Sequence, residues 1–162
     1  MIHWLLPSKG RARPKPGHKA VALLLAPIVA TCSACVPASP SAGTYRQRAS
    51  LTLGAAASEV GTMGTVVRLL DRGRMFRTTG TAQLRASEDQ LGTNDQAFSE
   101  LNPPPSQDHL EKRVSALLGD AEDLANQTRV AVARDNTAEY GQLARSLDAL
   151  AGRIERLESR VQ

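Results

Sequence analysis

Apolar side chains recur every third or fourth residue through most of the chain after position 45. The spacing is most regular near the C-terminus, where it forms two apolar stripes. The first stripe consists of Leu110, Val114, Leu117, Ala121, Leu124, Thr128 and Ala131, and the second of Tyr140, Leu143, Leu147, Leu150, Ile154, Leu157 and Val161. Steps of three and four residues keep one apolar face along an α-helix and do not suit a β-strand. Helices are therefore predicted over residues 106–134 and 137–161.

Two earlier segments carry similar stripes. The first consists of Leu53, Ala56, Val60, Met63, Val67 and Leu70, and the second of Leu84, Leu91, Phe98 and Leu101. They predict helices over residues 45–72 and 77–101. The second stripe is sparser, and Gly80 and Gly92 lie within it, so this helix is expected to begin late or to fray at its start.

The residues between these segments are typical of helix ends. Gly73 suits a C-terminal cap, and the prolines of Asn102-Pro-Pro-Pro105 stop the second helix. Ser106 is the expected N-cap of the third helix, with Asp108 in its first turn, while Asn136 and Glu139 resemble a capping box for the fourth. Because the loops are short, the pattern predicts an all-α, up-down-up-down antiparallel four-helix bundle.

The regular heptad of the predicted fourth helix also fits a coiled coil. A homodimer formed through this helix is therefore a second prediction from the same pattern. It concerns the assembly of the protein, whereas the four stripes concern the fold of one chain.

The N-terminal segment has a different composition. Residues 1–19 are basic, residues 20–30 are apolar, and no acidic residue precedes Glu59. This order is typical of a signal peptide, predicted here over residues 1–34 with a basic region 1–19 and an apolar region 20–30. The apolar run is shorter than a spanning helix needs, and Pro27 interrupts it, so a permanent transmembrane helix is the weaker interpretation.

Two cysteines follow the apolar run. Ser33 and Ala34 precede Cys35 as in a bacterial lipoprotein signal, so Cys35 is the predicted lipidation site and Cys32 the alternative. Residues 35–44, rich in Pro, Ser and Ala, are predicted to form a flexible tether before a bundle domain at 45–162. A cut around Ala42 would instead leave a secreted domain without thiols.

The charge of the whole chain is misleading about its partners. The chain has 20 basic and 16 acidic residues, a formal charge of +4. Five of the basic residues precede the apolar run, so a processed chain would carry a charge near −1. The basic charge therefore belongs to the targeting segment, and no nucleic-acid partner is expected.

A basic cluster stands out at the predicted turn between the first two helices. It consists of Arg68, Arg72, Arg74, Met75, Phe76 and Arg77. One interpretation is a contact site for a protein or an anionic envelope polymer. The other is that these arginines pair with acidic residues of the same bundle, while Met75 and Phe76 cap its end.

Residues for catalysis are not apparent. The sequence has no Gly-x-Ser-x-Gly, phosphate-loop or His-Glu-x-x-His motif, and a zinc site would need ligands beyond Cys32 and Cys35. His109, the one histidine after the targeting segment, lacks a Glu-x-x-His partner and is expected to be solvated. We therefore expect no enzyme activity, no cofactor and no metal.

Several short stretches carry a resemblance. They are Ser33-Ala-Cys35, Leu69-Leu-Asp-Arg-Gly-Arg-Met-Phe76, Leu101-Asn-Pro-Pro-Pro105 and His109-Leu110 at the head of a helix. In these the chain resembles uncharacterised exported helical-bundle proteins and putative lipoproteins of high-GC Gram-positive bacteria. The resemblance implies a helical bundle at the cell envelope and supplies no activity.

Together these features predict a non-enzymatic cell-envelope protein. It would be lipid-anchored at the outer face of the membrane or secreted, and would act as a binding or scaffolding module. The alternative is a sensor-type bundle whose core admits a small hydrophobic molecule, because its many Ala and Gly residues would leave space.

Overall fold

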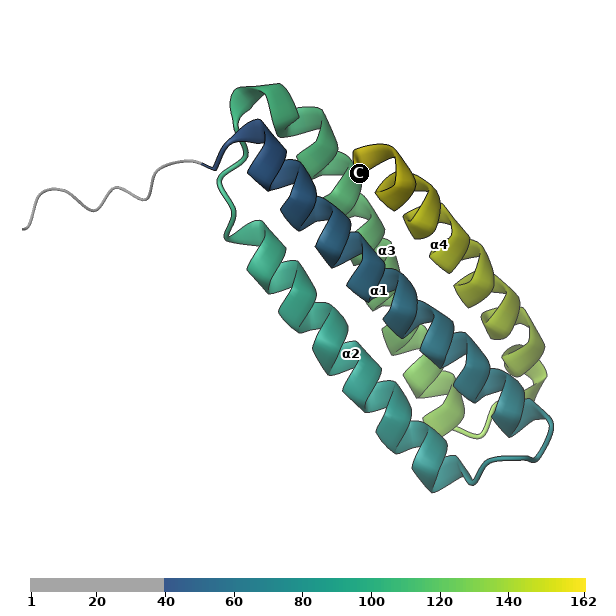
Figure 1. Cartoon of the computed structure of the whole chain (residues 1–162). Coiled ribbons are helices and arrows are strands. Elements are labelled where there is room, and N and C mark those ends of the chain that lie inside the picture. The colour runs from purple at the N-terminus through teal and green to yellow at the C-terminus, as the bar shows by residue number, and fades with distance from the viewer. Residues whose placement is uncertain (1–39) are drawn as a thin grey trace, which may run out of the picture. The chain divides into compact units, whose positions relative to one another are not determined.

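Four α-helices and two short 3-10 turns make up nearly all of the computed structural model, which describes residues 40–162. The elements are α1 (Ala42–Asp71), α2 (Arg77–Ser99), η2 (Pro105–Gln107), α3 (Asp108–Ala133), η3 (Thr137–Glu139) and α4 (Tyr140–Val161). The prediction of an all-α bundle of four helices is confirmed for this part of the chain (Figure 1). The predicted signal peptide, Cys32, Cys35 and residues 35–39 of the predicted tether lie outside the described residues.

The first two helices begin with well-defined ends. Ser41 caps α1, since its Oγ accepts a hydrogen bond from the backbone N–H of Thr44 at 3.1 Å. This cap starts α1 three residues before the predicted position 45. The second helix begins at Arg77 as predicted and without the expected fraying, and it ends at Ser99 rather than at 101.

The predicted caps of α3 and α4 are wrong, because a 3-10 turn precedes each helix. Ser106 lies inside η2, and Gln107 occupies the N-cap of α3 without a side-chain cap. Asn136 does not cap α4, since its Nδ2 donates to the Oε1 of Glu139 at 2.7 Å. Asp108 does lie in the first turn of α3, where the helix dipole favours an anion.

The ends of α1 and α3 share one geometry. Gly73 has φ +62°, its N–H donates to the carbonyl of Leu70 at 2.9 Å, and the N–H of Arg74 reaches the carbonyl of Leu69 at 2.8 Å. These two bonds form a Schellman motif and confirm the predicted glycine cap. After α3, Asp135 takes this position with φ +56°, which the sequence did not indicate.

The apolar stripes predicted from the sequence form one buried core. Its largest fully buried side chains come from all four helices and include Tyr45, Phe98, Leu118 and Ile154. The rings of Tyr45 and Phe98 lie 5.7 Å apart in a tilted arrangement. Burial is the main cause that raises the pKa of Tyr45, followed by the charges of two acidic residues at the start of α3.

The helices do not pack equally closely. α1 contacts α4 along its length, whereas α3 and α4 touch only sparsely. Glycines lie at this contact: a Cβ at Gly64 would touch the Cβ of Leu147 at 3.5 Å and would lie 3.1 Å from Oδ1 of Asp148. A Cβ at Gly54 would lie 3.1 Å from Oε1 of Glu158. Because α4 lies against α1, it leaves an open seam beside α3.

The two Schellman turns predict stability changes of opposite sign. Gly73→Ala forces a side chain into the left-handed region and should lower the free energy of unfolding by about 1 kcal/mol. Asp135→Gly relieves the same strain and should raise the free energy of unfolding by up to about 1 kcal/mol. The gain is reduced by the small contribution of the exposed ion pair with Arg77, which the substitution removes. Urea unfolding of both variants checks this prediction, and equal losses in both would contradict it.

Candidate functional site

The turn between α1 and α2 brings most of the predicted contact residues to one end of the bundle. Arg72 is the C-cap of α1, Phe76 is the N-cap of α2, and Arg74 and Met75 lie between them. The Schellman turn at Gly73 reverses the chain within a few residues. The side chains of this turn, which we call the tip (Arg72, Arg74, Met75 and Phe76), therefore lie together.

The two apolar residues of the tip differ in burial. Met75 is half-buried and packs against the core, whereas Phe76 is 83% exposed. The expectation that both residues cap the end of the bundle therefore holds for Met75 alone. A phenylalanine ring so fully exposed to water makes little contact with the rest of the bundle.

The arginines predicted to act together belong to different environments. The Nη1 of Arg68 donates to both carboxylate oxygens of Asp148 at 2.7 Å, so this residue joins α1 to α4 instead of the tip. The Nη1 of Arg77 lies 3.5 Å from Oδ2 of Asp135, which follows the end of α3. Within residues 40–162, Arg72 and Arg74 have no carboxylate within 4.0 Å. Internal pairing thus describes Arg68 and Arg77 but not the tip.

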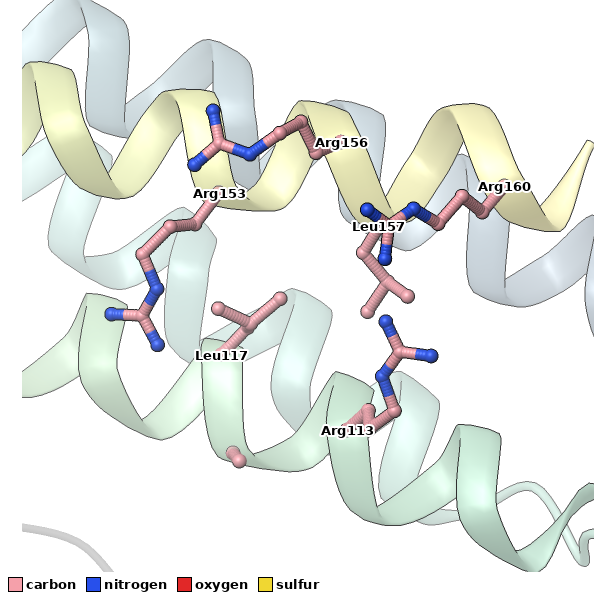
Figure 2. Close-up of a pocket in the computed structure, with 7 residues that line it drawn as sticks. Arg113, Leu117, Arg153, Arg156, Leu157 and Arg160 are labelled. Carbon is pink, nitrogen blue, oxygen red and sulfur yellow. The ribbon is translucent and has the colours of Figure 1, made fainter.

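A second basic surface lies in the seam between α3 and α4 and was not predicted from the sequence. It is a groove of about 320 Å³ lined by Arg113, Ala116, Leu117, Arg153, Arg156, Leu157 and Arg160 (Figure 2). We call it the arginine groove. Leu117 and Leu157 form its floor and are 8% and 3% exposed. The steps of three and four between residues 153, 156 and 160 place the three α4 arginines along one side of the helix.

Only one arginine of this groove is neutralised by a neighbour. The Nη2 of Arg153 lies 2.9 Å from Oδ2 of Asp120. In the described part of the chain, Arg113, Arg156 and Arg160 have no carboxylate within 4.0 Å. The guanidinium of Arg156 lies over Gly152, where an added Cβ would be 3.3 Å from its Nη1. Three guanidinium groups thus share the groove without a counter-charge.

Glu122 of α3 faces α2, where its Oε1 would lie 3.9 Å from a Cβ at Gly92. Burial is the main cause that raises the pKa of Glu122, followed by the charges of Asp95 and Asp123. Nearby, Glu88 accepts hydrogen bonds from Asn126 and Arg129 and so links α2 to α3. These contacts satisfy the carboxylate of Glu88 but leave Glu122 among like charges.

Residues 40–162 show no group of three His, Cys, Asp or Glu side chains that could hold a metal ion. His109 is exposed at the start of α3. Over the same residues, no helix combines the length and apolar character that crossing a membrane requires. Comparison with protein-family models, with curated proteins and with solved structures gave no match.

The environment of Glu122 predicts a pH dependence of stability. A raised folded-state pKa means that the native protein holds this proton more tightly than the unfolded chain, so stability falls as pH rises above the ordinary value of 4.5. Glu122→Gln removes the carboxylate. The variant should therefore be more stable than the unmodified chain at pH 7, and this advantage should shrink toward pH 4.

Urea unfolding at pH 4 and pH 7 measures the effect. Glu155→Gln, which removes an exposed carboxylate on α4, is the matched control and should show no such difference. A loss of stability at pH 7 in Glu122→Gln would mean that this carboxylate is stabilising, against the prediction.

Proposed function

We propose that the chain is a non-enzymatic binding module of the cell envelope, exported and then lipid-anchored through Cys35 or secreted. In this proposal, residues 40–162 form an up-down-up-down antiparallel bundle that presents the tip to a partner protein. Export is supported by the basic and apolar order of residues 1–30, and anchoring by Ser33 and Ala34 before the cysteine.

Residue pairs from neighbouring helices support the proposed topology. Gly54, early in α1, lies close to Glu158 late in α4, while Arg68 near the end of α1 pairs with Asp148 in the first half of α4. Between α2 and α3, Glu88 bonds Asn126. The rings of Tyr45 and Phe98 are also in contact, joining the start of α1 to the end of α2. Such pairing is expected when short loops connect helices that alternate in direction.

The exposure of Phe76 is the observation that carries the proposed contact site. It is 83% exposed beside Arg72 and Arg74, which are also exposed and lack carboxylate partners in the described part. Arginines and aromatic rings are the residues that dominate binding energies at protein interfaces. A ring gains most from a pocket of matching shape, and only a folded partner supplies one. We therefore favour a protein with an acidic, partly apolar surface over a charged polymer.

The position of the tip suits a tethered module. α1 contains 30 residues, so at ~1.5 Å per residue its two ends lie about 45 Å apart. The tip is at the end of α1 that is remote from residue 42, where the chain continues toward the predicted tether. A module held at its N-terminus would present the tip away from its anchor.

Photo-crosslinking in the cells that make the protein tests the contact site. A benzoyl-phenylalanine residue replacing Phe76 should yield an adduct with one polypeptide, and Arg72→Glu with Arg74→Glu should abolish that adduct. The matched control carries the same photo-reactive residue at Arg48, which is exposed near the start of α1, at the opposite end of that helix from the tip. Equal adducts from both positions, or none from position 76, would contradict the proposal.

The same cells test export and anchoring. The mature N-terminus should begin at Cys35 and carry an acyl mass that Cys35→Ser abolishes and Cys32→Ser does not. An acyl mass lost only with Cys32→Ser would move the anchor to the alternative cysteine. An unprocessed chain in the cytoplasmic fraction would refute export.

A further inference from the structure

We propose that the arginine groove between α3 and α4 is a binding site for an organic phosphate. Arg113 and Arg160 would hold the phosphate oxygens, Arg156 would add positive charge from α4, and the aliphatic part of the ligand would rest on Leu117 and Leu157. This inference goes beyond the proposed function, because the groove lies on a different surface from the tip and is built from different helices.

The charge of the groove calls for an anion. Arginine stays protonated at every physiological pH, so these side chains cannot relieve their mutual repulsion by losing a proton. In the described part of the chain, Arg68, Arg77, Arg129 and Arg153 are the arginines with a carboxylate within 4.0 Å. Arg113, Arg156 and Arg160 lack one, as other surface arginines do, but these three line the same groove. A bound anion would supply the missing counter-charge.

The geometry favours a phosphate over a carboxylate. Figure 2 shows the guanidinium groups of Arg113 and Arg160 reaching the same gap from α3 and α4. Two planar donor groups that meet at one gap, with Arg156 beside them on α4, match an anion with several oxygens, whereas a carboxylate offers two. Arg153 differs from the other three, because Asp120 already occupies its guanidinium at 2.9 Å.

The floor of the groove points to an organic ligand. Leu117 and Leu157 lie between the arginines, and Ala116 lies beside them, so part of the lining is apolar. A volume of about 320 Å³ is at the lower end of the range for small-molecule sites. Glycerol phosphate has this combination of charge and carbon backbone, and it occurs both in soluble form and in phospholipid headgroups.

Two matched double variants distinguish the effect of the groove from the effect of the total charge of the protein. Arg113→Gln with Arg160→Gln removes two cations from the groove, and Arg72→Gln with Arg74→Gln removes two from the tip. In low salt without phosphate, the groove variant should unfold at the same temperature as the unmodified chain or a higher one, because it loses like-charge repulsion. This measurement also shows that the groove variant folds.

Titration with glycerol 3-phosphate at constant ionic strength then tests binding by the full-length chain. The unmodified chain and the tip variant should gain thermal stability as the ligand is added. The groove variant should bind about tenfold more weakly or worse, since it lacks two charge-assisted contacts. A similar rise in all three proteins, or no rise in any of them together with no vesicle binding, would overturn the proposal.

Binding to lipid vesicles distinguishes a phospholipid headgroup from a soluble phosphate as the ligand. If the ligand is a lipid headgroup, the chain should bind phosphatidylglycerol-containing vesicles more tightly than phosphatidylcholine ones, and the groove variant should lose most of that difference. If the ligand is soluble, glycerol 3-phosphate should saturate the groove while vesicle binding stays the same in both variants. The crosslink from position 76 should persist in the groove variant, so that failure of one site is distinguishable from failure of the other.

Discussion

Close packing of α1 against α4 is the constraint on which the rest of the structure depends. Gly64 faces Leu147 and Asp148 without a side chain, and Gly54 does the same beside Glu158, so a large side chain at either position would hold the helices apart. The ion pair between Arg68 and Asp148 spans the same contact. Because dispersion and burial act only at short range, this approach fixes where α4 lies. α4 then contacts α3 sparsely, and the arginine groove occupies the seam between them.

Both candidate surfaces occur where the packing of the core ends. At the tip, Met75 closes the core while Phe76, next to it in sequence, is left in water. In the groove, Leu117 and Leu157 belong to the core on one side and form the floor of an open site on the other. Each surface thus places arginine beside apolar area, a combination that favours recognition of anionic ligands with apolar parts.

The sequence was sufficient to predict the number of helices and the composition of the core, because each stripe depends on local periodicity. Gly73 was predictable as a cap for the same reason. Asp135 was not, since a non-glycine residue with positive φ gives no clear sequence signal. The sequence left open whether Arg68 pairs within the bundle, and its partner could not be predicted because Asp148 is 80 residues away. The steps between Arg153, Arg156 and Arg160 were visible, but Arg113 joins them only through the register of α3 against α4.

A matched pair of glycine substitutions in α1 tests the central packing claim most directly. Gly64→Leu should lower the free energy of unfolding in urea by about 2 kcal/mol or more, because its side chain would meet Leu147 and Asp148. Gly61 has no neighbouring atom within 4 Å of an added Cβ, so Gly61→Leu should leave stability unchanged or raise it by about 0.5–1 kcal/mol. Equal effects at the two positions would contradict a close contact between α1 and α4.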